Sequence, residues 1–192
     1  MRETHLEDGK WWVSPYNFEP SVREGLMLPE KVEIHDATLR DGEQTPGVVF
    51  SVDDKIQIAT KLDELGVERI EAGMPAVSEM DQTAIKEISK LGLKSKIFTF
   101  ARAMKTDIDL ALECGADGVV IEVPIGYPKL VTQFGWTWRD VAEKTAPIIK
   151  YAKDNGPDRN LVIHHRQKAG PGRVNHSHQH DCCQCCRKHS KI

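Results

Sequence analysis

Short apolar runs alternate with longer amphipathic stretches between residues 31 and 163 of the 192-residue chain. The apolar runs are predicted to be strands, and Gly118–Val123 is almost wholly apolar, as expected for a strand covered on both faces. The predicted strands are Val32–Ile34, Val67–Ala72, Lys96–Ala101, Gly118–Val123 and a fifth that starts at Asn160–Ile163.

The stretches between these strands repeat apolar residues at helical spacing. The first begins after Ser51, a residue type that favours the N-cap position, and ends at Gly66, which suits a helix C-terminus. The predicted helices run from Ser51 to Leu65, from Ser78 to Leu91, from a cap at Thr106 to Leu112, and from Trp136 to Lys153.

Repeated strand–helix units predict a parallel sheet with right-handed crossovers. This pattern fits both a closed eight-unit barrel and an open doubly wound sheet. The first loop lacks the glycine-rich fingerprint of the open dinucleotide-binding class, and polar residues follow the strands, where barrel enzymes carry their sites. We therefore predict an α/β fold, a (β/α)8 TIM barrel. Since a barrel takes about 250 residues, residues 31–163 would form only its first four to five β/α units.

Both ends of the chain differ from this body. Residues 1–30 mix aromatic residues and prolines, and we expect an irregular lead-in that lies across the domain. Residues 164–192 hold six of the eight histidines and four of the five cysteines. They show no helical or strand period, so this tail is predicted to be disordered.

The tail has two interpretations. One is that the reading frame is lost near residue 163, so that the barrel breaks off there. The other is a metal-binding segment, because Cys182 and Cys185 form one C-x-x-C pair and Cys183 and Cys186 form a second. Two interleaved pairs cannot readily wrap one tetrahedral ion, which disfavours a structural zinc site.

Composition narrows the class of protein. The chain is 40% hydrophobic and 29% charged, with a formal net charge of −3. This balance gives no basic surplus for nucleic acid, and no apolar run approaches the roughly 20 residues of a membrane span. The first residues lack the layout of a signal peptide, so a cytoplasmic protein is expected.

Candidate chemistry gathers in the stretch Val32–Gly47, where the first strand runs into a turn carrying Arg40, Asp41, Glu43 and Gln44. A carboxylate is a hard ligand that suits Mg²⁺ or Mn²⁺, and a planar guanidinium grips a carboxylate with two hydrogen bonds. The turn therefore predicts a divalent metal beside a bound acid.

The segment Asp36–Gln44, which reads D-A-T-L-R-D-G-E-Q, resembles the first-strand signature of the pyruvate carboxyltransferase superfamily. That superfamily includes the 2-isopropylmalate, citramalate and homocitrate synthases and the HMG-CoA lyases. The resemblance covers roughly residues 30–163 and itself implies a TIM barrel.

The resemblance also implies roles for individual residues. Arg40 would be catalytic by stabilising the enolate or keto oxygen, and Asp41 would bind the divalent metal, Mg²⁺ or Mn²⁺ with Zn²⁺ as a further option. Glu43 would be catalytic and Gln44 substrate-binding, in the part of the motif nearest the substrate. The alternative for Glu43 is a carboxylate at a helix start.

Two further strand ends resemble the family. Glu71 begins an E-x-G-x-P segment and would face the keto acid, and Arg102 ends an A-R pair and would support the substrate carboxylate or a nearby glutamate. The fourth strand departs from the isopropylmalate synthases, which carry small hydroxyl residues and a histidine there. Glu122 and Tyr127 thus become candidate contacts, while His35 is expected to be a packed strand residue.

The implied reaction is a Claisen-type condensation of acetyl-CoA with a 2-oxo acid, in which the metal and Arg40 polarise the ketone. The partners would be these small molecules, with no nucleic acid or membrane, and the full-length family implies a homo-oligomer. One alternative is the reverse chemistry, a lyase resembling HMG-CoA lyase. Another is an inactive half-barrel, whose two open sheet edges would invite association.

The resemblance places an H-x-H metal pair on a later strand. His176-Ser-His178 has that spelling, but no apolar strand surrounds it, so the metal role is not carried over. We expect activity to be impaired by the missing strands.

Overall fold

The computed structural model describes residues 6–7, 10–26, 31–156 and 160–166, and the chain divides into two units at residue 32. In the first unit, β1 (Leu6–Glu7) pairs antiparallel with β2 (Trp11–Trp12). The helical turns η1 (Pro15–Phe18) and α1 (Pro20–Arg23) follow, each with proline at its start, where the missing N–H is not needed. The expected irregular lead-in therefore contains short regular elements.

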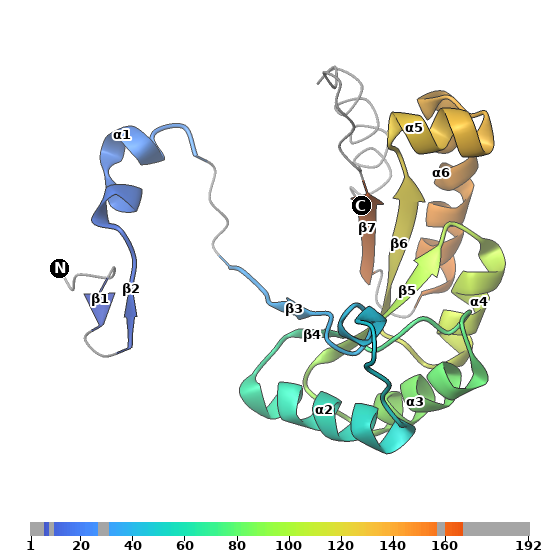
Figure 1. The fold of residues 1–192 in the computed structure, drawn as a ribbon, viewed down its shortest axis with the longest axis horizontal. Coiled ribbons are helices and arrows are strands. Elements are labelled where there is room, and N and C mark those ends of the chain that lie inside the picture. The colour runs from blue at the N-terminus through green and yellow to red at the C-terminus, as the bar shows by residue number, and fades with distance from the viewer. Residues whose placement is uncertain (1–5, 8–9, 27–30, 157–159, 167–192) are drawn as a thin grey trace. The chain divides into compact units, whose positions relative to one another are not determined.

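The second unit is built on five parallel strands whose order in the sheet is their order in the chain (Figure 1). They are β3 (His35–Asp36), β4 (Arg69–Glu71), β5 (Lys96–Arg102), β6 (Gly118–Pro124) and β7 (Asn160–Arg166). The last four lie where the apolar runs predict them. β7 continues three residues past the predicted boundary at 163.

The first strand lies later than predicted. Strand pairing begins at His35, whereas Val32 and Ile34 are 76% and 62% exposed. Only the carbonyl of Ile34 takes part in the sheet, by accepting a hydrogen bond from the Arg69 amide. Among the described residues β3 is an edge strand, so the apolar run before it has no second neighbour to pack against.

The helices agree with the predicted periodicity, with one exception at a cap. They are α2 (Val52–Leu65), α3 (Glu79–Lys90), α4 (Lys105–Glu113) and α6 (Trp138–Asn155). Ser51 caps α2, and Gly66 ends it with a left-handed φ of 90°. Thr106, the predicted cap of α4, instead lies inside the first turn, after Met104. No prediction covers α5 (Tyr127–Lys129) and the π-helical turn η3 (Leu130–Phe134).

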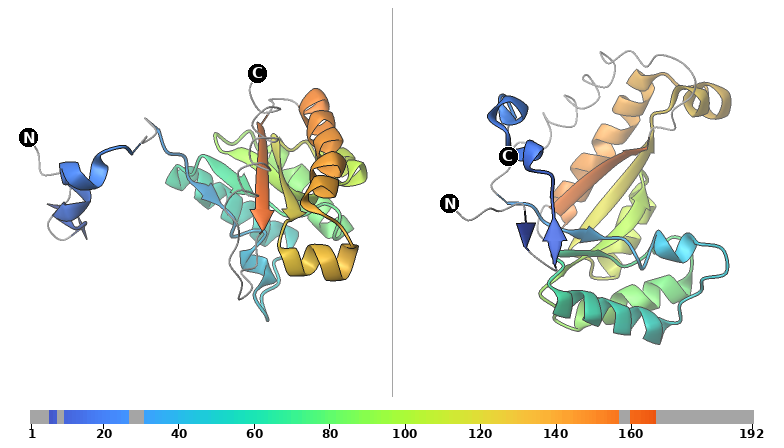
Figure 2. Two further views of the ribbon diagram at one scale, coloured as in Figure 1. Left: turned by 90° about the horizontal axis from the view of Figure 1, so that it is seen from above. Right: turned by 60° about the vertical axis from the view of Figure 1, so that its left-hand side comes forward.

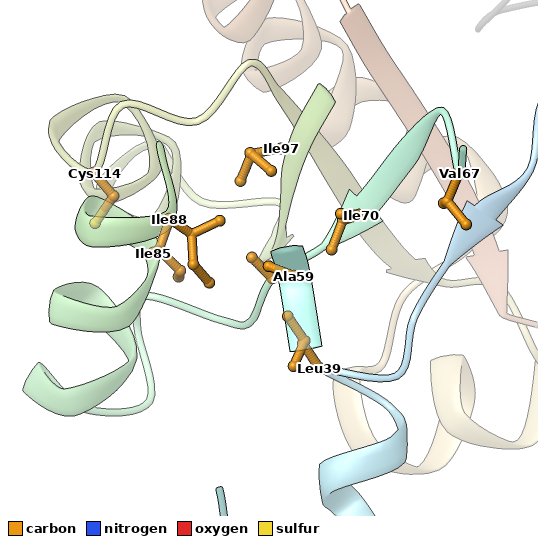
Figure 3. Packing of buried hydrophobic residues seen from close by; sticks show 9 residues of the cluster. Leu39, Ala59, Val67, Ile70, Ile85, Ile88, Ile97 and Cys114 are labelled. Carbon is orange, nitrogen blue, oxygen red and sulfur yellow. The ribbon is translucent and has the colours of Figure 1, made fainter. Parts of the chain in front are cut away.

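Helices α2, α3, α4 and α6 pack on one face of the sheet, as the two views of Figure 2 show. Side chains from α2 and α3 meet β4 and β5 in one apolar cluster, which includes Leu39, Ile70, Ile85 and Ile97 (Figure 3). A second cluster joins α4 and α6 to β5 and β6. The opposite face carries Phe98, Phe100 and Val120.

One-sided helix cover over parallel strands is the arrangement of the first part of a β/α barrel.

Within the described ranges no helix is long and apolar enough to cross a membrane.

Candidate active site

The turn after β3 carries one fully buried apolar side chain, which anchors it to the core. Leu39 is fully buried, while Asp41 in the same turn is exposed. The carbonyl of Ala37 accepts hydrogen bonds from the amides of Arg40, Asp41 and Gly42, which folds the chain back on itself. Burial of Leu39 therefore fixes the neighbouring polar side chains at the strand end.

Arg40 and His35 both reach across to Glu71 at the end of β4. Arg40 Nε donates to Glu71 Oε1 at 2.5 Å, and His35 Nε2 lies 3.1 Å from Oε2. The side chains of Arg40 and Glu71 are 16% and 3% exposed. Two strand ends predicted from separate motifs thus meet in one largely buried ion pair, with His35 as an additional member.

The charges of this group lie against aromatic rings on the sheet face opposite the helices. The Arg40 guanidinium carbon is 4.5 Å from the centre of the Phe100 ring, and the His35 ring meets Phe98 edge-on at 5.5 Å. Burial raises the pKa of Glu71, but hydrogen bonds from His35 and Arg40, together with their charges, lower it by more. Glu71 is therefore a carboxylate at neutral pH.

Asp41 is the exposed member of the site. Arg40 Nη1 donates to its Oδ1 at 2.7 Å, and its side chain is 64% exposed. Its oxygens are hard donors of the kind that Mg²⁺ and Mn²⁺ prefer. The described part of the chain contains no group of three or more His, Cys, Asp or Glu side chains that could hold a metal ion. Asp41 fits one position in a coordination shell, but the described residues do not form a complete one.

Glu43 points away from this group. Its Oε1 accepts a hydrogen bond from the Phe50 amide at 3.1 Å, and its Oε2 lies 2.7 Å from Lys55 Nζ. Glu43 lies in the first turn of the short helix η2 (Gly42–Gln44), as the helix-start alternative describes, and its catalytic role stays a prediction. Gln44 is exposed at the end of the turn, and its amide donates to the Asp41 carbonyl.

Arg102 is not brought to Glu71. Its Nε and Nη2 form a two-pronged ion pair with Asp107 at 2.8 and 2.9 Å, in which Arg102 is 57% exposed and Asp107 is 2% exposed. Burial raises the pKa of Asp107, but the hydrogen bonds and charge of Arg102 lower it by more. Glu122 lies beside Arg102 in the sheet register, and its other register partner is His164.

Three of the interpretations concern parts of the chain outside the described residues. The side chain of Tyr127 lies outside the description, as do the H-x-H and C-x-x-C motifs after residue 166.

Sequence reasoning misses two charged residues close to the site, Lys55 and Asp81. Lys55 is fully buried on the inner face of α2, and its ammonium lies 2.5 Å from Asp81 Oδ1. A signal for it exists, because Lys55 stands four residues before the buried Ala59, on the stripe that should be apolar.

Comparison with known proteins identifies the family. A profile of the HMGL-like family matches residues 31–186, which is most of the chain. The chain belongs to the HMGL-like family. This confirms the resemblance to the pyruvate carboxyltransferases, and the matched range runs past residue 163.

Characterised relatives of this HMGL-like chain include two synthases. It is 45% identical over 143 residues to homocitrate synthase AksA of Methanopyrus kandleri, covering 74% of this chain and 36% of that protein. It is 46% identical over 125 residues to (R)-citramalate synthase CimA of Methanocaldococcus jannaschii, covering 65% of this chain and 26% of that protein. The matched part of the chain thus spans between about a quarter and somewhat over a third of the length of these relatives.

The fold has counterparts among solved structures. The HMG-CoA lyase of Bacillus subtilis superposes with a TM-score of 0.66 at 15% identity, covering 83% of this chain and 55% of the lyase. At that identity the likeness concerns the fold alone, and it supports the assignment to the first part of a β/α barrel.

Proposed function

We propose that this HMGL-like chain carries the 2-oxo acid site of an enzyme that condenses acetyl-CoA with a 2-oxo acid, as the names of its synthase relatives suggest. The observation that carries the proposal is the Arg40–Glu71 pair, a largely buried ion pair at the ends of two adjacent strands with the exposed carboxylate of Asp41 beside it. Barrel enzymes place their chemistry at these strand ends.

In this proposal Arg40 supplies positive charge where negative charge develops. The methyl carbon of acetyl-CoA, after loss of a proton to a base, forms a bond to the oxo carbon, and the oxo oxygen becomes an alkoxide. Water then hydrolyses the thioester and releases the CoA thiol. Glu71 and Phe100 hold the guanidinium in place before the reaction, so little reorganisation is needed when the charge appears.

Asp41 would contribute one oxygen ligand to a divalent metal, which when bound would polarise the oxo group. The described residues contain no group of three or more His, Cys, Asp or Glu side chains that could complete the coordination shell. Gln44, exposed at the end of the same turn, would contact the acid from the solvent side.

The experiment measures CoA thiol release from acetyl-CoA with Mg²⁺ or Mn²⁺ and either 2-oxoglutarate or pyruvate, the acids whose acetyl adducts are homocitrate and citramalate. Arg40→Lys keeps a positive charge but loses the planar fork. Arg69→Lys is the matched control, because Arg69 also lies over a ring, that of Phe98, and pairs with a carboxylate, that of Glu33.

We expect thiol release that requires the 2-oxo acid, falls roughly 100-fold in Arg40→Lys and is unchanged in Arg69→Lys, since loss of one preorganised donor costs a factor of that order. Cleavage of HMG-CoA without condensation would support the lyase alternative instead. If the chain neither releases thiol with a 2-oxo acid nor forms acetoacetate from HMG-CoA, a catalytic role for this chain is refuted.

A further inference from the structure

Three of the described helices begin with the same motif, a Ser or Thr followed three residues later by Asp. In two of them the Asp carboxylate turns back to the cap residue, accepting from the Ser51 amide at 2.9 Å and from the Thr137 amide at 2.7 Å. Each forms a closed capping box. The third motif, Ser78 to Asp81, is closed on one side only, by the bond from the Asp81 amide to Ser78 Oγ.

The carboxylate of Asp81 is directed to other groups. Its Oδ1 lies 2.5 Å from Lys55 Nζ, and its Oδ2 accepts from the Met74 amide at 3.1 Å. A Cβ on Gly73 would lie 3.2 Å from the same Oδ2, and the φ of Gly73 is 150°. The backbone after β4 thus approaches this carboxylate as closely as glycine permits.

Lys55 joins that carboxylate to the turn after β3. Its ammonium is fully buried between Asp81 Oδ1 and Glu43 Oε2, the latter at 2.7 Å. Burial lowers the pKa of Lys55, and the two carboxylates raise it by more, so the lysine stays charged. Removing one member would leave buried charge without compensation.

These contacts complete a ring around the site. Arg40 pairs with Glu71, and three residues later in the same turn Glu43 pairs with Lys55. Lys55 pairs with Asp81, which holds the Met74 amide three residues beyond Glu71. The ends of β3 and β4 are therefore fixed to each other at two points. One is the Arg40–Glu71 pair, and the other is the link from Glu43 through Lys55 to Asp81.

We propose that Lys55 is a positioning residue that sets the placement of the Arg40–Asp41 turn relative to the end of β4. It does so through its ion pairs with Glu43 and Asp81. Glu43 then acts by holding the turn and has no contact with substrate. What the positioned turn does rests on the proposed function; the positioning itself concerns only the fold.

Residue-resolved amide hydrogen exchange of the full chain, without substrate or metal, tests the positioning. In Lys55→Met we expect exchange at the Phe50, Asp41 and Met74 amides to rise about 100-fold, because the unpaired carboxylates leave their sites. Amides of β6 and α6 keep their protection. Lys61→Met is the matched control, since Lys61 lies on the same helix in an exposed pair with Glu64.

Two milder variants keep the test decisive should Lys55→Met fail to fold. Glu43→Gln is expected to speed amide exchange at Phe50 and Asp41 and to leave exchange at Met74 unchanged. Asp81→Asn should speed exchange at Met74 and leave the other two unchanged. A uniform increase in exchange rate over all amides would overturn the proposal, and so would an unchanged rate at the Phe50, Asp41 and Met74 amides. Because no turnover is measured, failure of the condensation assay leaves this result unaffected.

If the chain does condense its substrates, Glu43→Gln should lower kcat more than it raises KM for the 2-oxo acid, because a displaced Arg40 stabilises the developing negative charge less well. If Glu43 only stabilised the fold, the substitution would change neither kcat nor KM of the protein that remains folded.

Discussion

Replacing Glu71 by Gln removes the charge at the centre of the site while keeping the shape of the side chain. Glu71 is 2% exposed and receives hydrogen bonds from Arg40 at 2.5 Å and from His35 at 3.1 Å. Removal of one partner from a buried pair costs about 3–5 kcal/mol. Arg40 keeps Asp41 and the Phe100 ring as partners, so we expect a loss of roughly 2–3 kcal/mol.

Urea unfolding followed by far-ultraviolet circular dichroism measures this loss at pH 7. With a slope of about 1–3 kcal/mol per molar urea, the midpoint should fall by roughly 0.7–3 M. Glu64→Gln removes the same charge from an exposed pair and should change stability by less than about 0.5 kcal/mol.

The pH dependence separates charge from packing. The folded state lowers the pKa of Glu71, so its contribution is fully present above the unfolded pKa of about 4.3 and is lost as pH falls through the folded value. The difference between wild type and Glu71→Gln should therefore be constant above about pH 5 and shrink below about pH 4. A difference under about 0.5 kcal/mol at pH 7, or one that persists unchanged at acid pH, would refute the ion-pair reasoning.

Two further predictions concern the backbone that carries the site. Leu39→Ala should lower the free energy of unfolding by about 2–5 kcal/mol in the same urea assay, because it empties a fully buried position under the turn; Leu65→Ala, at a 77% exposed leucine, is the control. Gly73→Ala should lower the melting temperature through about 1–3 kcal/mol of backbone strain and contact with Asp81, whereas Gly47→Ala, also at positive φ but with open space around its Cβ, should show only the strain.

The sequence predicts the sheet and helices well where periodicity and caps agree. Ser51 and Gly66 bound α2 as expected, because cap and stop signals are local. Thr106 fails as a cap because α4 starts earlier: the amides of Asp107 and Ile108 both donate to the Met104 carbonyl, which makes Met104 the cap residue. The first strand starts later than predicted because no described element covers Val32 and Ile34, and a local apolar pattern does not tell whether such cover exists.

The site shows the same division. The meeting of Arg40 with Glu71 follows from two motifs at adjacent strand ends, and the geometry brings them together. The environment of Glu43 does not follow, because Lys55 stands where the helical stripe predicts an apolar residue, and its second partner lies 26 residues further on. Residue roles inferred from a motif thus need the contacts that only the fold supplies.

The order of strands in the sheet bears on how the chain forms during synthesis. Each strand pairs with its neighbour in sequence, so every closure spans only the segment between two consecutive strands and carries a modest entropic penalty. All members of the ring from Arg40 to Asp81 belong to the first two strand–helix units. Since chains emerge from the ribosome N-terminus first, the charged framework of the site can assemble before the later strands have been translated.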